Sequence, residues 1–231
     1  YKIGSTNAEE RLIMNGYQDN GTALLNDTTW AVAMGGDGME CAIDYQDPNF
    51  MYGSIYYGSI SRSTDYGYSF QPIANNGRNG INESGDWVTP YGLHSLDPNK
   101  MFIGYKNLWR SDNVKNGDPT TIRFSKISNL TTTQNIRVVE HSAADQNLLF
   151  FSNSNQLFKS NNVSTAASSV VFTQITSPTG INRITDILCD TRNAQIVYAL
   201  RDNKVWKSTN QGTSWVDYSG TLPNIPMNSI I

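Results

Sequence analysis

Two aspartates in this sequence have neighbours that would suit catalysis. Asp37 lies in a Gly-Gly-Asp-Gly run and Asp86 in a Gly-Asp-Trp run, and glycine neighbours let a backbone approach a ligand closely. A glycoside hydrolase needs two carboxylates facing each other across a cleft, separated by roughly 5 to 9.5 Å according to its mechanism. Asp37 and Asp86 are therefore the candidates for such a pair.

A structural role for the same carboxylates competes with catalysis. Short acidic side chains also accept hydrogen bonds from nearby backbone N–H groups and hold loops in place. We expect this role for Asp19, Asp37 and Asp86, which stand in the loops that lead into apolar strands. The sequence favours this interpretation, so no residue is assigned as catalytic.

The histidines and cysteines give no further sign of chemistry. His94 and His141 follow apolar strands at matching repeat positions, which indicates architecture and not acid–base catalysis. Cys41 and Cys189 fall in equivalent strands of non-neighbouring repeats, so we expect two separate buried thiols and no disulfide. These residues have no metal-ligand spacing, and we expect neither a metal nor a cofactor.

Charge and apolar runs argue against nucleic-acid binding and against a membrane-spanning segment. Charged residues make up 16% of the chain, the formal net charge is −3, and no Lys/Arg cluster could follow a phosphate backbone. We therefore expect no nucleic-acid binding. No run approaches the roughly 18 apolar residues of a membrane helix, so we expect no membrane-spanning segment.

A repeat organises most of the chain. Four segments, at residues 55–63, 104–111, 152–160 and 200–208, each close on a basic residue followed by serine. These serines stand at 63, 111, 160 and 208, so the intervals are 48, 49 and 48 residues. Each repeat contains an apolar strand, an Asx-rich turn and three further short strands. Four short strands with a period in the forties predict a blade of a β-propeller.

The repeat defines the expected domain organisation. We predict an all-β propeller of four-stranded antiparallel blades at residues 1–36, 37–76, 86–130, 135–177 and 182–220. Residues 1–4 read as the first strand, and residues 227–231 as the first strand of a further blade. A propeller leaves an open edge unless it closes on itself, so we expect a section of a larger propeller.

Two turns between third and fourth strands share a Ser-x-Asp/Asn-x-Gly-x-Ser-aromatic pattern. In such a turn the Asp or Asn side chain binds backbone N–H groups, glycine permits a positive φ, and the aromatic ring fills the space between sheets. We expect a structural role here and not a ligand site. The pattern residues are Ser63, Asp65, Gly67 and Phe70 in one turn, and Ser208, Asn210, Gly212 and Trp215 in the other.

Further motifs carry a resemblance to a known family. They are Gly-x-Gln-Asp-Asn-Gly-Thr at 16–22, Trp30 followed by Gly-Gly-Asp-Gly at 35–38, Gly-Asp-Trp-x-x-Pro at 85–90 and Leu-Pro-x-x-Pro at 222–226. With the two turns, they resemble the Asp-box (bacterial neuraminidase repeat) propellers of sialidases, sortilin and the tandem-propeller xyloglucanases. The sequence is most similar to secreted propellers of Bacteroidetes-type bacteria, many exported by the type IX secretion system.

The resemblance implies activities that the residues do not support. A sialidase would need three arginines at the starts of inner strands, and the arginines here do not supply them. The catalytic motifs of the xyloglucanases are also absent. Because one fold hosts many activities, the resemblance indicates architecture more than function.

We therefore expect a secreted or cell-surface propeller that acts as a non-catalytic binding or scaffold module for a glycan or a protein. One alternative is a polysaccharide-active glycoside hydrolase of the Asp-box propeller type, with part of its active site on missing blades. The other is a type IX secretion cargo or surface-complex subunit, with secretion or outer-membrane surface proteins as partners. Aromatic residues of the loops, such as Tyr17, Trp30, Tyr56 and Tyr57, would supply contact area. The ligand-binding candidates are Gln18, Asp19, Asn20, Asp37, Glu40, Asp86, Trp87 and Tyr91.

Overall fold

The computed structural model describes residues 3–131, 133–154 and 156–231 of the chain. The chain divides into two compact units. Unit 1 comprises the residues up to Tyr105 together with Trp109–Lys126, and unit 2 comprises Lys106–Leu108 together with Ile127–Ile231.

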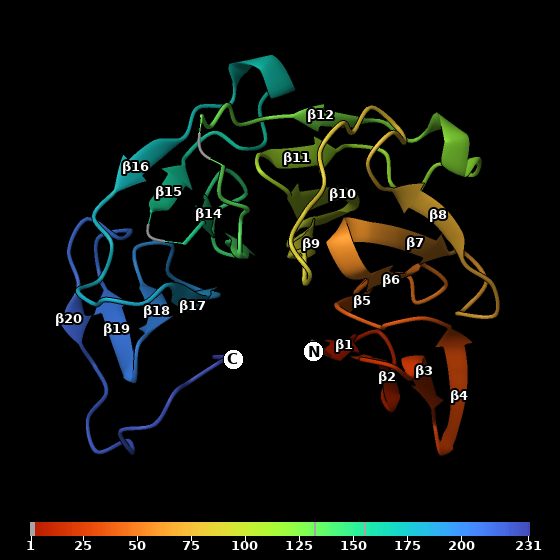
Figure 1. Ribbon diagram of the computed structural model, residues 1–231, viewed down its shortest axis with the longest axis horizontal. Helices are drawn as coiled ribbons and strands as arrows, with labels where there is room; N and C mark the ends of the chain where they lie inside the picture. Colours follow the sequence, from red (N-terminus) through yellow and green to blue (C-terminus); the bar gives the residue numbers. More distant parts are fainter. Residues whose placement is uncertain (1–2, 132, 155) are drawn as a thin grey trace. The chain divides into compact units, whose positions relative to one another are not determined.

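Unit 1 contains three four-stranded antiparallel sheets in which consecutive strands pair (Figure 1). The first sheet consists of β1 (Ile3–Ser5), β2 (Leu12–Tyr17), β3 (Gly21–Asn26) and β4 (Thr29–Met34). The second consists of β5 (Cys41–Ile43), β6 (Met51–Ile55), β7 (Ser59–Ser63) and β8 (Gln71–Ala74). The third consists of β9 (Tyr91–His94), β10 (Asp97–Gly104), β11 (Leu108–Ser111) and β12 (Phe124–Lys126).

Unit 2 contains two sheets of the same kind. One consists of β13 (Val138–His141), β14 (Leu149–Ser152), β15 (Leu157–Ser160) and β16 (Thr173–Ile175). The other consists of β17 (Ile184–Cys189), β18 (Val197–Arg201), β19 (Lys204–Ser208) and β20 (Val216–Asp217). Among the described residues, helix is limited to the three short 3₁₀ segments Tyr56–Gly58, Pro119–Thr121 and Ala167–Ser169.

The five sheets confirm the expected all-β fold of four-stranded antiparallel blades. Each residue range expected for a blade contains one sheet. The first strand begins at Ile3, and Tyr1 and Lys2 of the expected strand lie outside the described residues. Residues 227–231, expected as a further first strand, form no strand in the structure. They lie along β17, where the Thr185 hydroxyl donates to the Met227 carbonyl at 2.9 Å.

The core lies between sheets that follow one another in the chain. In β2, Leu12, Met14 and Gly16 are buried, and the residues between them are only half-buried, as period-two alternation requires. The second strand of a later sheet, β14, is buried along its whole length. Sheets one and two share one apolar cluster, sheets two and three a second, and sheets four and five a third. The first strands of adjacent sheets, β1 with β5 and β13 with β17, pack against each other.

The same hydrogen-bond arrangement recurs at the end of the third strand in the second, third, fourth and fifth sheets. The hydroxyl of the closing serine donates to the Asp or Asn side chain two residues further on, and that side chain accepts an N–H just ahead of the fourth strand. Loop insertions do not disturb this arrangement, because the side chain still reaches the N–H beyond the insertion. The four pairs and their acceptor contacts are Ser63–Asp65 to Ser69 N, Ser111–Asn113 to Arg123 N, Ser160–Asn162 to Val171 N, and Ser208–Asn210 to Ser214 N.

The glycine and the aromatic residue of the pattern act on packing. Gly67 has a φ of 85°, and a side chain there would lie 2.7 Å from the Leu24 side chain. Gly212 has a φ of 78°. Phe70 packs on the apolar cluster between sheets one and two, and Trp215 packs on the cluster between sheets four and five. These contacts hold the turns against the body of each unit.

The two cysteines lie in different units. Cys41 and Cys189 are both free and buried, in agreement with separate thiols. Burial raises the pKa of the Cys41 thiol to about 12, and burial also raises the pKa of Cys189. The chemical reactivity of each thiol should therefore report the unfolding of the unit in which it lies.

Candidate functional site

A shallow pocket of about 480 Å³ lies between loops of the first and second sheets of unit 1. Two loops border it, one between β2 and β3 and one between β4 and β5, and Tyr56 closes it from the second sheet. The lining residues are Asp19, Asn20, Gly21, Gly35, Gly36, Asp37 and Tyr56. We call this cavity the unit 1 pocket.

Hydrogen bonds and close backbone contacts hold the two loops together. The Asp37 Oδ1 atom accepts the backbone N–H of Asp19 at 2.7 Å, and Asp19 has a left-handed φ of 64°. The Gly38 N–H donates to the Tyr17 carbonyl at 3.0 Å. A Cβ atom at Gly38 would lie 2.1 Å from the carbonyl oxygen of Gly21, so glycine is required for this approach. The sequence motifs at 16–22 and 35–38 thus meet at one place.

An aromatic group adjoins the pocket. It consists of Tyr56, Tyr57 and Trp87, and Tyr56 belongs both to the group and to the pocket lining. The Tyr56 and Trp87 rings stack with centroids 5.4 Å apart and planes inclined by 14°. Tyr57 meets both rings edge-on, at 5.5 and 5.7 Å. Tyr56 and Tyr57 remain 39% and 53% exposed, so a ring surface is open to a ligand.

Backbone contacts fix the aromatic group on its two loops. The Tyr57 N–H donates to the Trp87 carbonyl at 3.4 Å, and the Gly85 N–H donates to the Tyr57 carbonyl at 3.2 Å. Gly58 has a φ of 78°, and the buried Tyr105 hydroxyl donates to its carbonyl at 2.7 Å. A Cβ atom at Gly58 would lie 2.4 Å from the Tyr105 ring. The position of the rings therefore depends on a glycine that cannot carry a side chain.

The structure brings together only some of the predicted ligand-binding residues. Asp19, Asn20 and Asp37 line the unit 1 pocket, and Trp87 belongs to the aromatic group. Gln18 is exposed beside them, and its carbonyl accepts the Asn20 side-chain amide at 3.2 Å.

Asp86 does not line the pocket with Asp37. Its Oδ1 atom accepts the backbone N–H of Trp87 at 2.8 Å. The hydrolase hypothesis placed Asp37 and Asp86 as a pair across a cleft, and the pocket contains only the first of them.

Glu40 and Tyr91 are buried and contact each other between adjacent blades. The Glu40 carboxylate accepts the Tyr91 N–H at 3.3 Å, and the Tyr91 hydroxyl donates to the Glu40 carbonyl at 2.8 Å. A carboxylate also joins adjacent first strands in unit 2, where Glu140 accepts the Cys189 N–H at 2.9 Å. Asp186 accepts the Ile230 N–H at 3.1 Å and so holds the segment that lies along β17. These carboxylates bind neighbouring backbone segments, and we assign them no ligand.

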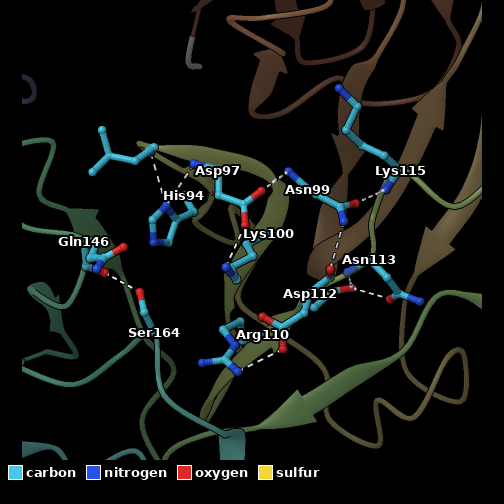
Figure 2. A network of polar contacts seen from close by, with 12 residues as sticks. His94, Asp97, Asn99, Lys100, Arg110, Asp112, Asn113, Lys115, Gln146 and Ser164 are labelled. Atoms are coloured by element: carbon cyan, nitrogen blue, oxygen red, sulfur yellow. Dashed lines mark hydrogen bonds and ion pairs between the residues drawn. The ribbon is translucent and has the colours of Figure 1, made fainter.

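The buried histidines stabilise turns. The Nδ1 atom of His94 accepts the N–H groups of Leu96 and Asp97, both at 3.1 Å (Figure 2). The Lys100 ammonium, 2.6 Å from the Asp97 carboxylate, lowers the pKa of that carboxyl group. His141 contacts the Gln146 carbonyl at 3.1 Å in unit 2, and the Ser164 hydroxyl donates to the same carbonyl (Figure 2).

In unit 1, Asn99 joins the start of β10, just after the His94 turn, to the loop that follows β11 (Figure 2). Its side-chain amide donates to the Asp112 carbonyl at 3.0 Å, and its Oδ1 atom accepts the Lys115 N–H at 3.0 Å. Arg110 pairs with the Asp112 carboxylate at 2.9 Å. Arg62 is buried as well and donates to the carbonyls of Val114 and Asn116. These basic side chains fasten loops together.

A second pocket, in unit 2, was not predicted from the sequence. Its volume is about 520 Å³, and we call it the unit 2 pocket. Four separate segments line it. They are the turn between β14 and β15, the loop that leads into β17, the turn between β18 and β19, and residues 226–228. Pro226 ends the Leu-Pro-x-x-Pro motif, and the other segments carry no recognisable motif. The lining residues are Ser154, Ile181, Asn182, Arg183, Thr185, Asp202, Asn203, Pro226, Met227 and Asn228.

The described residues contain neither a metal-binding cluster nor a membrane-spanning helix. Over residues 3–131, 133–154 and 156–231, no group of three or more His, Cys, Asp or Glu side chains lies close enough to hold a metal ion. Within the same part of the chain, no helix has the length and apolar character needed to cross a membrane.

Comparison with known proteins supports the fold. Neither the known protein families nor the curated proteins include a match to this sequence. Solved structures do match. PorZ, a bacterial surface component of the type IX secretion system of Porphyromonas gingivalis, has a TM-score of 0.67 at 13% identity, over 98% of this chain and 35% of PorZ.

Two other structures are similar to a comparable degree. YCF48 bound to D1 peptide has a TM-score of 0.62 at 11% identity, over 96% of this chain and 68% of that protein. An ancestral GH74 enzyme has a TM-score of 0.60 at 20% identity, over 78% of this chain and 24% of the enzyme. The chain thus spans about a quarter of the GH74 enzyme and about a third of PorZ. At these identities the likeness shows the β-propeller fold and nothing of the activity.

Proposed function

We propose that this chain is a non-catalytic binding module that holds a glycan on the unit 1 pocket and the adjoining aromatic group. The observation that carries the proposal is the double role of Tyr56, which stacks on Trp87 and also lines the pocket. A pyranose ring has an apolar C–H face and a rim of hydroxyl groups. The exposed aromatic rings suit the face, and the oxygens of Asp19, Asn20 and Asp37 suit the rim.

The hydrogen bonding of Asp37 and the position of Asp86 favour binding over hydrolysis. Asp37 already accepts the Asp19 N–H at 2.7 Å, so it holds the loop that forms the pocket wall. Asp86, the other candidate catalytic residue, is absent from the pocket lining. Glycan hydrolysis stays the second candidate because Asp19 and Asp37 place two carboxylates in one cavity.

We further propose that the module works outside the cell or at its surface. The chain is acidic and rich in Asn, Ser and Thr, and its fold is similar to that of PorZ, a bacterial surface component. YCF48, with the same fold, is known with a bound peptide. A protein partner from a secretion or outer-membrane surface complex is therefore the alternative ligand.

Binding to a panel of neutral polysaccharides, followed by calorimetry with the best oligosaccharide, tests the proposal. We expect Tyr56→Ala to weaken binding by about tenfold or more, since aromatic anchors dominate such surfaces. Tyr56→Phe should bind like the parent protein because it keeps the ring. Tyr68→Ala is the matched control, because Tyr68 is 86% exposed in the same unit and outside the pocket.

Three results would contradict this function. Binding to an extended peptide with no binding to any polysaccharide would replace the glycan by a protein partner. Equal losses in Tyr56→Ala and Tyr68→Ala would remove the site. Release of reducing sugar that Asp37→Asn abolishes would make the chain a hydrolase.

A further inference from the structure

We propose that the unit 2 pocket is a separate binding site for a sugar acid, with Arg183 as the group that holds the carboxylate. The pocket combines a guanidinium with amide and hydroxyl side chains, and a hexuronate combines one carboxylate with several hydroxyls. A planar guanidinium matches a carboxylate in two parallel hydrogen bonds. The site differs from the unit 1 pocket in its residues and in the charge of its ligand.

Arg183 is available for such a ligand. It lies immediately before β17, is exposed, and lines the cavity. No hydrogen bond or ion pair joins its side chain to any other residue in the part of the chain that the structure describes. Its charge therefore faces solvent at the edge of a cavity of about 520 Å³.

The carboxylate in the same pocket is occupied by other groups. Asp202 accepts the backbone N–H groups of Ile181 and Asn182, both at 3.1 Å, and the Asn182 side-chain amide at 2.6 Å. Burial by itself would raise the pKa of Asp202. The hydrogen bonds from Ile181 and Asn182 outweigh that effect, so the pKa lies below its ordinary value. Asp202 thus fixes the loop that carries Arg183 and is not ion-paired with it.

The loop is held from its other side by Arg201. The buried Arg201 guanidinium donates to the Asn182 carbonyl and to the Pro178 carbonyl, both at 2.7 Å. Two neighbouring residues of one β-turn, Arg201 and Asp202, therefore clamp the backbone on both sides of Ile181. A binding group carried by a loop fixed in this way loses little conformational freedom on binding.

A second arginine strengthens the positive field at this end of unit 2. Arg137 stands immediately before β13, the first strand that packs against β17. Burial, and then the positive charge of Arg183, lower the pKa of Arg137. The two guanidinium groups therefore repel each other, and a bound anion would relieve that repulsion.

The rest of the lining suits hydroxyl groups. The Asn203 amide nitrogen donates to the Asn224 Oδ1 atom at 3.1 Å, which leaves its own Oδ1 atom as an acceptor. Ser154 and Asn228 add further polar groups to the wall. This polarity favours a sugar acid, whose hydroxyl groups can form hydrogen bonds with these side chains, over a simple aliphatic carboxylate, which has no such groups.

Titration of the full chain with D-galacturonate, with galactose and acetate as comparison ligands, tests the proposal. We expect galacturonate to bind and both comparison ligands to bind at least about tenfold more weakly, because one lacks the charge and the other the hydroxyls. Arg183→Gln should weaken galacturonate binding by about tenfold or more, and Arg183→Lys should restore only part of it. Arg192→Gln is the matched control, an exposed arginine of unit 2 outside the pocket.

The outcomes separate this proposal from the proposed glycan site of unit 1. Arg183→Gln must leave binding of neutral oligosaccharide unchanged, and Tyr56→Ala must leave binding of galacturonate unchanged. Equal binding of galactose and galacturonate, or no loss in Arg183→Gln, would overturn the sugar-acid site. Acetate or a peptide carboxylate that binds as well as galacturonate would also overturn it. Unchanged thermal unfolding of Arg183→Gln shows that the variant is folded.

Discussion

The two pockets of this chain differ in the charge and the ring surface that they offer a ligand. The unit 1 pocket has two carboxylates, one amide, bare glycine backbone and an aromatic ring, and the unit 2 pocket has a guanidinium, several amides, hydroxyls and one carboxylate that is bonded to its own loop. Yet both lie among the loops that connect strands of four-stranded sheets. The blades thus supply one frame, and the loops alone decide the chemistry.

The pockets also differ in how their loops are fixed. Unit 1 relies on residues without side chains, since Gly38 and Gly58 leave no room for a Cβ atom. Unit 2 relies on one carboxylate, Asp202, that accepts three N–H groups. We therefore expect the unit 1 loops to lose their conformation when a side chain is added, and the unit 2 loop to lose its conformation when the Asp202 side chain is removed.

The largest effect should come from Gly58→Ala. The added methyl group would lie 2.4 Å from the buried Tyr105 ring, and residue 58 has a φ of 78°. Overpacking together with a strained backbone should lower the free energy of unfolding by about 3 kcal/mol. Urea unfolding measures this loss.

Gly92→Ala is the matched control, because nothing lies within 4 Å of the position of its Cβ atom. Thiol labelling then shows which unit is affected. Cys41 should become reactive in Gly58→Ala before Cys189 does, because Cys41 is in the same unit as Gly58. Equal exposure of both thiols would mean that the two units do not respond separately.

A smaller effect should come from Asp202→Ala in unit 2. The substitution removes three hydrogen bonds, but the side chain is partly exposed, so we expect a loss of about 1 kcal/mol in unfolding free energy. Galacturonate binding should fall further than stability, because the loop before Arg183 loses its anchor. Isothermal calorimetry and urea unfolding of the same variant separate the two effects.

Asp217→Ala provides the control within the same sheet. Asp217 is exposed and pairs with the exposed Lys204 at 2.7 Å, and such a surface ion pair contributes little to stability. Neither galacturonate binding nor the unfolding midpoint should change measurably. If Asp202→Ala behaves like this control, the carboxylate does not organise the unit 2 pocket.

The fold could be predicted because its signal is local. The serines at 63, 111, 160 and 208 recur at nearly constant spacing, and each stands at the end of a third strand. Strand, turn and strand then follow from alternation and from Asx residues. Even the turns with insertions after Ser111 and Ser160 kept their serine-to-Asn contact.

The candidate site could be predicted only in part, because contacts between blades leave no motif. Asp19 and Asp37 were found because each stands in a glycine-rich loop of its own. Glu40 and Tyr91 also stand where a loop enters a first strand, but the packing of adjacent first strands buries both side chains. The unit 2 pocket needs four distant segments to come together, and nothing in the spacing of Arg183, Asp202 and Asn228 indicates that they do.

The smallest effect concerns two turns, one in each unit, that have Asp65 and Asn210 at the same position of their shared pattern. Asp65 accepts the Ser69 N–H at 2.9 Å and the Ser63 hydroxyl at 2.7 Å, and Asn210 accepts the Ser214 N–H and the Ser208 hydroxyl, both at 2.9 Å. Only the aspartate titrates. The hydrogen bonds from Ser69 and Ser63 lower the pKa of Asp65.

Because that pKa is lower in the folded state, Asp65 adds stability above its ordinary pKa and loses it as the pH falls through the lowered value. Asp65→Asn should therefore unfold slightly more easily at pH 7, by less than about 1 kcal/mol for this exposed group. The difference from the parent protein should disappear between about pH 5 and pH 2. Asn210→Asp should introduce the same pH dependence into unit 2, since its turn has matching contacts. A stability difference for Asp65→Asn that stays constant across this pH range would show that shape alone, and not charge, distinguishes the two turns.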